Sequence, residues 1–339
     1  MWRELGYPNP FWAVEVGSGD GVLSSDILSC APQLGSEFLE SLRYVCLDRY
    51  PTVTHLRDLE GTKSPAGIIA TDGIPLRGVV GCVLSNELLD SFPVHRLTMD
   101  CGVLKEVYIT VQEGKYSEVL DLPSTPLLED RLRRVGIIPA EGSWLEINLV
   151  MDAWLEAVAT SLERGYVLTI DYGDLSEGLY SSSNSRGTLV TYRNHVQRDD
   201  PYSHIGEQDI TAKVDFTALI EAGKRHGLET LGFTNQRRFF NNLGLQNLIR
   251  KLSPIGRTQR EMEANMMGML EIAKPGGMGD FKVLVQGNHI SDEEIWGIES
   301  SIEVEELAGN LLTPLLTRQH TPLLEGRYPY NLSAFSPMQ

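Results

Sequence analysis

The first half of the chain alternates short apolar runs with amphipathic stretches. Apolar runs at 11–16, 43–48, 66–71 and 78–86 are bounded by turn-forming residues, and residues 22–30 carry apolar side chains at helical spacing. Runs of this kind, separated by helical segments, predict parallel strands joined by crossover helices. We therefore predict an α/β fold with a mostly parallel, Rossmann-like sheet and helices on both faces.

The pattern changes after this region. Residues 95–120 read as consecutive antiparallel strands around two turn signals, which predicts an insertion into the sheet or an extension of its edge. We expect a long helix over 144–165, with Gly165 as its stop signal, and a further core strand over 166–173.

Two later regions are weakly apolar. Residues 174–212 are rich in Ser, Asn, Asp and Gly, which predicts a long loop. Residues 288–339 hold eight acidic residues against two arginines, which predicts an acidic C-terminal extension. We therefore expect a single domain over 1–287, followed by that extension.

Charge and composition narrow the class of partner. The chain has 29 basic and 46 acidic residues, a net charge of −17, which disfavours binding to phosphate backbones and suits a basic protein partner or simple solubility. Its apolar runs are shorter than the roughly 18–20 residues of a membrane span. The N-terminus lacks a secretory pattern, and the four cysteines form no CxxC pair. We expect a cytoplasmic protein that has no metal site and binds neither nucleic acid nor membrane.

The sharpest chemical motif is a glycine loop between the first strand and the first helix. It reads Glu15-Val16-Gly17-Ser18-Gly19-Asp20-Gly21. Glycines let the backbone approach a ligand closely, and the following helix N-terminus offers free N–H groups. An acid before the glycines can balance the ammonium or sulfonium of S-adenosylmethionine but would repel a pyrophosphate, so the loop favours the methyl donor over NAD. A purely structural turn is the remaining alternative.

Acids at the ends of the next two strands can complete a cofactor site. Asp48 ends the second strand, where a carboxylate can accept hydrogen bonds from a ribose diol; a solvated strand-end acid is the alternative. Asp72 follows the third strand and is a candidate to face adenine.

The fourth strand ends in Ser85-Asn86-Glu87-Leu88-Leu89-Asp90. Ligands of open α/β sheets bind outside the carboxyl ends of the strands, so Asn86 and Glu87 should lie beside the glycine loop. Glu87 could accept hydrogen bonds from a guanidinium or amine and align it with the methyl group. An N-capping cluster on the next helix is the alternative. Asp171-Tyr172-Gly173 ends the fifth strand at the same edge, although a tyrosine beside a carboxylate is also a common structural contact.

Several segments together resemble one family, the MidA-like S-adenosylmethionine-dependent methyltransferases, whose mitochondrial members are complex I assembly-factor protein arginine methyltransferases. The similar segments occur in the family's order, and they are VEVGSGDGVLSSDIL (14–28), SNELLDSFPVHRL (85–97), LTIDYGDLSEG (168–178), RGTLVTYRNH (186–195), GEQDITAKVDFTALIEAG (206–223), TNQRRFFNNLG (234–244) and MGDFKVLVQ (278–286). The resemblance implies a class I methyltransferase fold, S-adenosyl-L-methionine as cofactor, and an acceptor protein with an accessible arginine, such as a respiratory complex subunit.

Residue matches to the family's motifs assign the site. They place Gly17, Gly19 and Gly21 at the cofactor, together with Glu15, Asp48 and Asp72 from the residue arguments above. They place Asn86, Glu87 and Asp90 in the NExxD signature as catalytic candidates. Asp171 and Tyr172 of the IDYG signature, with His195, are the candidates for substrate binding.

The chain departs from the family pattern in two places. Only 16 residues precede Gly17, where the family usually has several tens of residues that help to close the cofactor site. Lys213 stands where the family usually has histidine, so no role of that histidine is carried over. We predict a protein arginine methyltransferase and keep a nonenzymatic assembly factor or chaperone with the same fold as the alternative.

Overall fold

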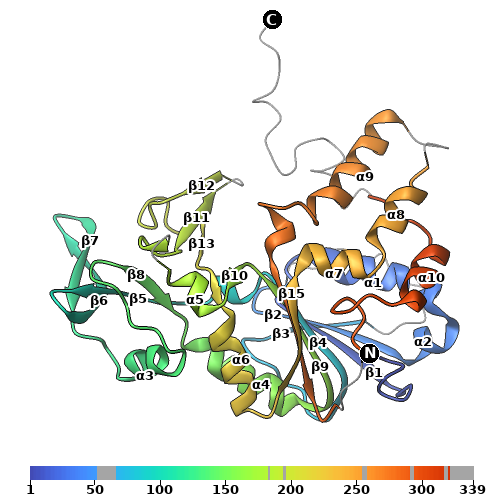
Figure 1. The fold of residues 1–339 in the computed structure, drawn as a ribbon, viewed down its shortest axis with the longest axis horizontal. Helices are drawn as coiled ribbons and strands as arrows, with labels where there is room; N and C mark the ends of the chain where they lie inside the picture. Colours follow the sequence, from blue (N-terminus) through green and yellow to red (C-terminus); the bar gives the residue numbers. More distant parts are fainter. Residues whose placement is uncertain are drawn as a thin grey trace, which may run out of the picture. The chain divides into compact units, whose positions relative to one another are not determined.

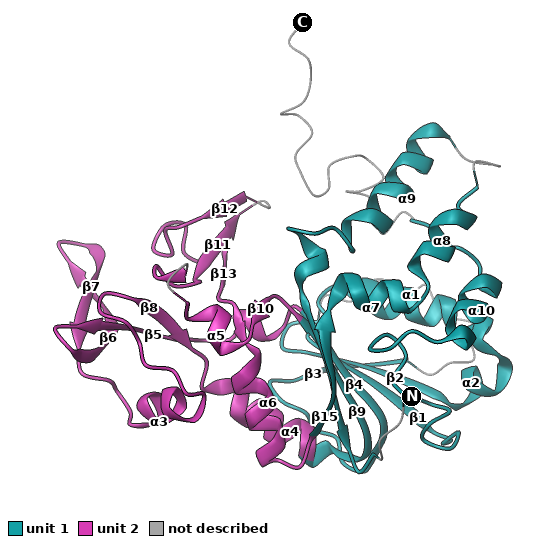
Figure 2. Ribbon diagram, in the orientation of Figure 1, with its two compact units in different colours: residues 1–86, 160–170, 229–339 teal, residues 87–159, 171–228 magenta. Residues whose placement is uncertain are grey.

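The protein forms two compact units. The computed structural model describes residues 1–51, 66–181, 184–193, 196–253, 258–290, 294–316 and 320. Unit 1 consists of Met1–Asn86, Thr160–Ile170 and Glu229–Gln339, and unit 2 consists of Glu87–Ala159 and Asp171–Leu228 (Figure 2). Each unit therefore brings together segments that are far apart in the sequence. The division at residue 287 stays a prediction.

Unit 1 is built on a seven-stranded sheet with the order β15-β16-β9-β4-β1-β2-β3 among the described residues (Figure 1). Neighbouring strands from β9 to β3 run parallel, and β15 runs antiparallel to β16. The strands are β1 Phe11–Val16, β2 Leu42–Asp48, β3 Ala66–Ala70, β4 Val79–Asn86, β9 Leu162–Asp171, β15 Glu229–Asn235 and β16 Lys282–Asn288. The predicted mostly parallel α/β sheet is confirmed.

The strand order reverses at β1. β2 and β3 lie on one side of β1, and β4 and β9 lie on the other side. The register places Val14 of β1 between Val45 of β2 and Val83 of β4. Such a switch point leaves a crevice outside the carboxyl ends of the strands, where open α/β sheets bind ligands. The loop after β1 begins at this edge.

The central strands bury both faces. Val14, Cys46 and Val83 have no exposed surface, and Tyr166 on β9 has none either. Parallel strands covered on both faces read as continuous apolar runs rather than alternating ones, which is why these segments could be recognised from the sequence. Each fully buried side chain of this size contributes about 1.5–3 kcal/mol of transfer free energy.

Short helices connect or follow the strands of unit 1. They are α1 Val22–Cys30, α2 Ser36–Ser41, α7 Gln236–Asn242, α8 Leu245–Lys251, α9 Gln259–Glu271 and α10 Ile302–Asn310, with 3-10 turns at Ala31–Leu34 and Met278–Asp280. Local chemistry sets their bounds: Thr258 and Glu261 form a capping box at α9, and Gly244, with a φ of 84°, separates α7 from α8.

Unit 2 is rich in antiparallel strands. Its four-stranded sheet has the order β7-β6-β5-β8, its three-stranded sheet has the order β12-β11-β13, and β10 pairs with β14. The strands are β5 His95–Asp100, β6 Val103–Gln112, β7 Lys115–Asp121, β8 Trp144–Ile147, β10 Gly173–Asp174, β11 Val190–Arg193, β12 Val196–Arg198, β13 Asp209–Thr211 and β14 Val214–Asp215. The antiparallel strands predicted over 95–120 are present.

A separate core holds this part of the chain together. Leu97 of β5 and Leu145 and Ile147 of β8 are buried against Leu128 and Leu132. The last two residues lie on α3 Leu127–Arg134, and the other helical segments are η3 Leu89–Ser91, α4 Val150–Ser161, α5 Ser176–Leu179 and α6 Phe216–Arg225. Asp215 caps α6 by accepting from Ala218 N at 3.1 Å.

The helix predicted over 144–165 is wrong at both ends. Trp144–Ile147 is strand β8 and pairs with β5, and only Val150–Ser161 is helical. Gly165 lies inside β9, where a Cβ would come within 2.1 Å of the Gly81 carbonyl oxygen. This glycine therefore permits the close approach of β9 to β4 and does not stop a helix.

The long loop predicted over 174–212 is also only partly correct. The described residues of this region contain α5 and the three short strands β11, β12 and β13. β11 pairs with β13, and the residue pattern of neither segment reveals this pairing.

The structure describes residues 288–290, 294–316 and 320 of the predicted C-terminal extension. Residues 294–316 belong to unit 1 and include α10.

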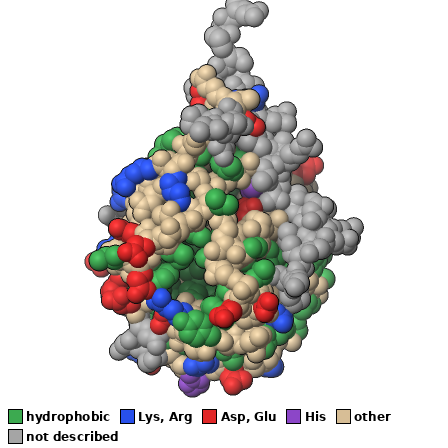
Figure 3. Space-filling view, turned by 90° about the vertical axis from the view of Figure 1, so that its right-hand side faces the viewer, with side chains coloured by type: hydrophobic (Ala, Val, Ile, Leu, Met, Phe, Trp, Pro, Cys, Tyr) green, Lys and Arg blue, Asp and Glu red, His purple; other side chains and the backbone are tan. Residues whose placement is uncertain are grey.

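Across the described residues, the helices are too short or too polar to span a membrane. On the face shown in Figure 3, acidic and basic side chains lie at several places among hydrophobic ones.

Candidate functional site

Three left-handed glycines shape the loop after β1. Gly17, Gly19 and Gly21 have φ values of 77°, 53° and 82°, a region that other residues rarely adopt. Gly17 N donates to the Leu47 carbonyl at 2.8 Å, which fastens the loop to the end of β2. Gly21 is the N-cap of α1 and supplies no capping side chain. At exposed Gly19 the loop therefore presents backbone without a side chain.

Asp48 supports the tip of this loop. Gly19 N donates to Asp48 Oδ2 at 3.0 Å, and Tyr50 N donates to Oδ1 at 2.8 Å. A Cβ on Gly19 would meet nothing within 4 Å, so the loop leaves room for a ligand there. A carboxylate has about four acceptor positions, so Asp48 can hold the loop and still accept from a ribose hydroxyl. Its contact with the cofactor stays a prediction.

Glu15 lies beneath the loop in the core. It is 4% exposed, and its Oε2 accepts from the Tyr44 hydroxyl at 2.9 Å and from Cys46 Sγ at 3.9 Å. Burial raises the pKa of Glu15 to about 7, and the hydrogen bonds from Tyr44 and Cys46 act in the opposite direction. Its described partners are thus side chains of β2, which the sequence argument did not identify.

Asp72 lies at the surface. Its carboxylate pairs with Arg49 Nε at 2.6 Å, and its side chain is 76% exposed. Because exposed ion pairs contribute little to stability, this contact leaves Asp72 open to a ligand without favouring one. The adenine contact stays a prediction.

Asn86 and Glu87 lie where β4 ends. Asn86 is the last residue of the strand and is in register with Ile170 of β9. Glu87 follows with a φ of 48°, which costs a non-glycine residue about 1–2 kcal/mol. Such strain persists where the surrounding structure holds it, and it is frequent at functional sites. The N-capping alternative for this segment finds no support in η3, which has no side-chain cap.

Asp171 holds the segment that follows Glu87. It has no exposed surface, and its Oδ2 accepts from the backbone N–H groups of Leu88, Leu89 and Asp90 at 3.2, 2.9 and 3.4 Å. Its Oδ1 accepts from Tyr172 N at 2.9 Å. Burial and the charge of Asp90 raise the pKa of Asp171, and these four donors favour its ionised form. The geometry gives Asp171 a positioning role, and its contact with substrate stays a prediction.

Asp90 is the distinctive group of this cluster. It is 6% exposed, and its Oδ1 has no hydrogen-bond partner among the described residues. Burial, together with the charge of Glu87, raises the pKa of Asp90 to about 6. A buried carboxylate oxygen without a donor is costly, so it is suited to a ligand that carries N–H groups and positive charge.

Two tyrosines lie around these acids. The Tyr172 hydroxyl hydrogen-bonds Thr211 Oγ1, and burial raises the pKa of Tyr172. Burial and the charges of Asp90 and Glu87 also raise the pKa of Tyr192. The sequence argument missed Thr211 and Tyr192, although both lie in segments that resemble the family. His195, a predicted substrate residue, lies outside the described residues.

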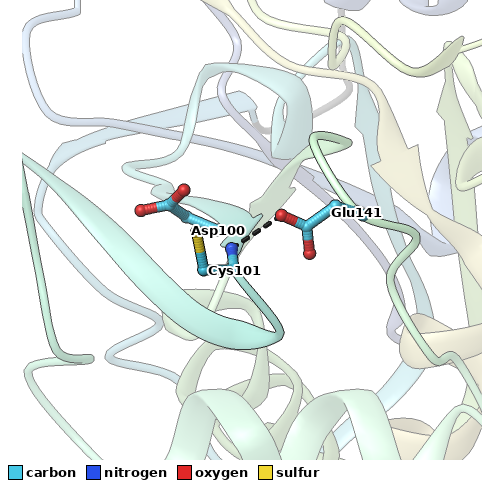
Figure 4. Close-up of side chains that lie close together, drawn as sticks. All are labelled: Asp100, Cys101 and Glu141. Atoms are coloured by element: carbon cyan, nitrogen blue, oxygen red, sulfur yellow. Dashed lines mark hydrogen bonds between the residues drawn. The ribbon is translucent and has the colours of Figure 1, made fainter.

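A possible metal group exists elsewhere in unit 2. Within the described ranges, Asp100, Cys101 and Glu141 bring one ligand atom each to within 4.8 Å, and all three are exposed (Figure 4). Glu141 accepts from Cys101 N at 2.6 Å and from Gly102 N at 3.0 Å, so its carboxylate fixes the turn between β5 and β6. The expected absence of a metal stays a prediction.

Curated relatives are similar in sequence to most of this chain. It is 29% identical over 259 residues to the mitochondrial protein arginine methyltransferase NDUFAF7 homolog of Drosophila melanogaster, a match that covers 68% of this chain and 55% of the relative. It is 26% identical over 276 residues to mitochondrial NDUFAF7 of Rattus norvegicus, covering 72% of this chain and 59% of the relative. The chain thus spans a little over half of the length of these relatives.

A solved structure shares the fold. A protein of Burkholderia thailandensis bound to S-adenosyl-homocysteine superposes with a TM-score of 0.75 at 26% identity, covering 89% of this chain and 75% of that one. A native crystal structure from the same organism gives a TM-score of 0.72 at 25% identity, with 88% and 78% covered. These likenesses confirm the predicted class I methyltransferase fold.

The comparisons also correct one expectation. A cytoplasmic location was expected from the N-terminal sequence and the unpaired cysteines, but this is contradicted because the matched curated relatives, including those of Caenorhabditis elegans and Homo sapiens, are named as mitochondrial.

The family itself follows from a match over more than half of the chain. A family whose description reads "Putative S-adenosyl-L-methionine-dependent methyltransferase" matches residues 1–234, which include the glycine loop, the segment from Asn86 to Asp90, and Asp171. This match confirms the resemblance to the family. It also confirms S-adenosyl-L-methionine as the family's cofactor, which we inferred from the residues. The chain belongs to this family of S-adenosyl-L-methionine-dependent methyltransferases.

Proposed function

We propose that this chain is a methyltransferase that transfers a methyl group from S-adenosyl-L-methionine to an arginine of an acceptor protein. The observation that carries the acceptor half of the proposal is the buried Asp90 Oδ1, which has no partner among the described residues. A guanidinium offers five N–H donors and a positive charge, and it therefore suits this oxygen and the neighbouring Glu87 better than a neutral acceptor would.

The residues of the loop after β1 fit the proposed cofactor. Gly17, Gly19 and Gly21 give the loop its left-handed turns, Gly19 is exposed with open space where a Cβ would lie, and Asp48 stands at the end of β2 with acceptor positions to spare. When bound, S-adenosyl-L-methionine supplies a methyl group that is already activated by its sulfonium. The protein's own contribution is therefore mostly positioning and electrostatics.

The acids of unit 2 have complementary tasks at the acceptor. Glu87 orients the guanidinium through charge-assisted hydrogen bonds, and Asp171 keeps the backbone of residues 88–90 in place for it. Asp90, with its raised pKa of about 6, can accept the proton that a guanidinium nitrogen must lose when it becomes methylated. The role we assign to Asn86, the last residue of β4, is to fix the loop or the acceptor.

The names of the relatives support arginine as the acceptor. The matched relatives are called protein arginine methyltransferases of mitochondria. We extend the proposal to a mitochondrial acceptor, and the family resemblance extends it further to a subunit of a respiratory complex.

Glu87→Gln tests the proposal because it keeps the shape of the side chain and removes its charge. Tritium transfer from labelled S-adenosyl-L-methionine is measured on a lysate of cells that lack this gene, which supplies unmethylated acceptor. We expect methyl transfer to fall about 10²-fold, while calorimetric titration gives an almost unchanged Kd for the donor. The matched control is Glu129→Gln, an exposed acid on α3.

Three outcomes would contradict the proposal. Wild-type protein that binds the donor and labels no band would favour the nonenzymatic assembly factor. A labelled band whose methyl group is found on a residue other than arginine would refute the acceptor. Equal transfer by Glu87→Gln and wild type would remove Glu87 from the site.

A further inference from the structure

A cavity of about 570 Å³ opens beside Asp90 in unit 2. Its size lies within the roughly 300–1,000 Å³ of ligand pockets. Apolar side chains form most of its walls, among them Phe92, Val107, Ile109, Tyr116, Ile205 and Ile210. These residues come from the segment after η3, from the four-stranded sheet, from the region before β13 and from β13 itself, so the cavity is a product of the tertiary fold.

Three ionisable groups in its walls, His95, Arg96 and Glu106, have partners of opposite charge. His95 Nδ1 lies 2.7 Å from Glu106 Oε1. Arg96 pairs with Glu118, and the Tyr202 hydroxyl donates to Glu118 Oε1 at 2.6 Å. Because these charged groups have partners, the apolar surface is the larger part of the wall that is left for a ligand.

Three polar atoms of cavity-lining residues have no hydrogen-bond partner within the described part of the chain. They are the acceptors Asp90 Oδ1 and Gln208 Oε1 and the donor Arg96 Nε. The Gln208 orientation is set by its Nε2, which donates to the Asp200 carbonyl at 3.1 Å. Buried polar atoms are rarely left unpaired, so this set indicates a ligand with N–H donors and at least one carbonyl acceptor. A polypeptide that carries a guanidinium has both.

The apolar walls of the cavity indicate that the ligand carries a second, apolar group. Ile109, Tyr116 and Ile205 line the cavity, yet their side chains are 58%, 51% and 59% exposed. The Tyr116 and Tyr202 rings stack with centroids 6.3 Å apart, which makes a flat wall suited to another ring. A guanidinium at the acidic end would leave these surfaces uncovered.

We propose that this cavity binds an apolar or aromatic side chain that lies within a few residues of the methylated arginine in the acceptor polypeptide. The inference rests on the proposed function, because it assumes that the arginine occupies the acidic end at Asp90. Charge complementarity and the apolar wall thus act together: the acids select the arginine, and the cavity selects its sequence context.

The test uses glycine–serine peptides with one arginine and with Phe, Leu, Ala or Asp placed one to four residues to either side. Binding is measured by fluorescence anisotropy of labelled peptides, and kcat/KM by tritium transfer. We expect Phe and Leu to improve both Kd and kcat/KM about tenfold or more over Ala at one offset, and Asp to weaken both.

Variants locate the effect. Ile109→Ser should lower the affinity for the Phe peptide to that for the Ala peptide, because it removes an apolar wall at an exposed position where folding is little affected. Val119→Ser is the control. Val119 of β7 is opposite Tyr108 in register, whereas Ile109 is opposite Glu118, so Val119 lies on the other face of the same sheet. The Phe preference should persist in this variant.

The binding and transfer measurements separate the two proposals. Peptides that bind with the Phe preference but accept no methyl would contradict the proposed function and leave the cavity's specificity standing. Binding without preference at any offset, or a preference that survives Ile109→Ser, would overturn the inference. Free arginine methylated as well as the best peptide would overturn it too, since a small molecule would then be sufficient.

Discussion

Replacing Asp171 by asparagine should loosen the segment that carries Glu87 and Asp90. The wild-type carboxylate accepts four backbone N–H groups, three on Oδ2 and one on Oδ1. Asparagine has a single acceptor oxygen. If that oxygen replaces Oδ2, the amide NH₂ faces Tyr172 N–H, and if it replaces Oδ1, the NH₂ faces the other three donors. At least one buried N–H loses its acceptor in either orientation.

The size of the effect follows from that count. A buried donor without an acceptor costs about 1–3 kcal/mol. The loss of repulsion between Asp171 and Asp90, which together with burial raises the pKa of Asp171, offsets part of this cost. We therefore expect the free energy of unfolding of Asp171→Asn to be about 1–3 kcal/mol lower at pH 7.5, by chemical denaturation followed by circular dichroism.

Function should respond more strongly than stability. Methyl transfer should fall at least tenfold, because the backbone that positions the catalytic candidates is no longer fixed. The Kd of the donor should change less than the transfer rate, since the glycine loop and Asp48 make no described bond to Asp171. Asp121→Asn is the control: exposed Asp121 accepts one N–H, from Leu122 at 2.7 Å, which asparagine can also accept. An Asp171→Asn variant with wild-type stability and wild-type transfer would refute the reasoning.

The other predictions concern unit 1. Gly19→Val should abolish donor binding, because a β-branched residue is strained at a φ of 53° and fills the open side of the loop; wild-type titration by a folded variant would reject the cofactor site. Asp48→Ala should weaken donor binding about tenfold, whereas exposed Asp72→Ala should change it less; the reverse order in calorimetry would contradict the ribose assignment. The raised pKa of Glu15, about 7 against 4.5, means that the folded state binds more protons between these values. The free energy of unfolding should therefore fall by up to about 3 kcal/mol as pH rises from 4.5 to 7, and Glu15→Gln should flatten that dependence; an equally steep profile would show that Glu15 is not its source.

Local pattern was sufficient for the central sheet. β1, β2 and β4 are largely buried on both faces, so each appears in the sequence as a mostly apolar run of strand length. The local pattern was not sufficient for β8, because the mostly apolar segment Trp144–Ile147 is followed closely by residues at helical spacing. They become a strand only by pairing with His95–Thr98, nearly fifty residues earlier. Pairing at that distance leaves no periodicity in a single segment.

The candidate site divides in the same way. The glycine loop is a local motif, and its three left-handed glycines could be expected from the spacing alone. The hydrogen bonds of Asp171 to the Leu88–Asp90 backbone join residues 81 to 83 positions apart, and no local rule predicts them. The same is true of Tyr44 beside Glu15, which the parallel pairing of β1 and β2 brings together.

The bonds of Asp171 also have an evolutionary consequence. Unit 2 is made of two stretches of chain, residues 87–159 and 171–228; Asp171, the last residue of β9, begins the second stretch, and three of its donors belong to the first. A descendant that lost the first stretch would keep a buried carboxylate without three of its donors, and one that lost the second would keep those donors without the carboxylate. Lineages of this family should therefore keep or lose the two stretches together.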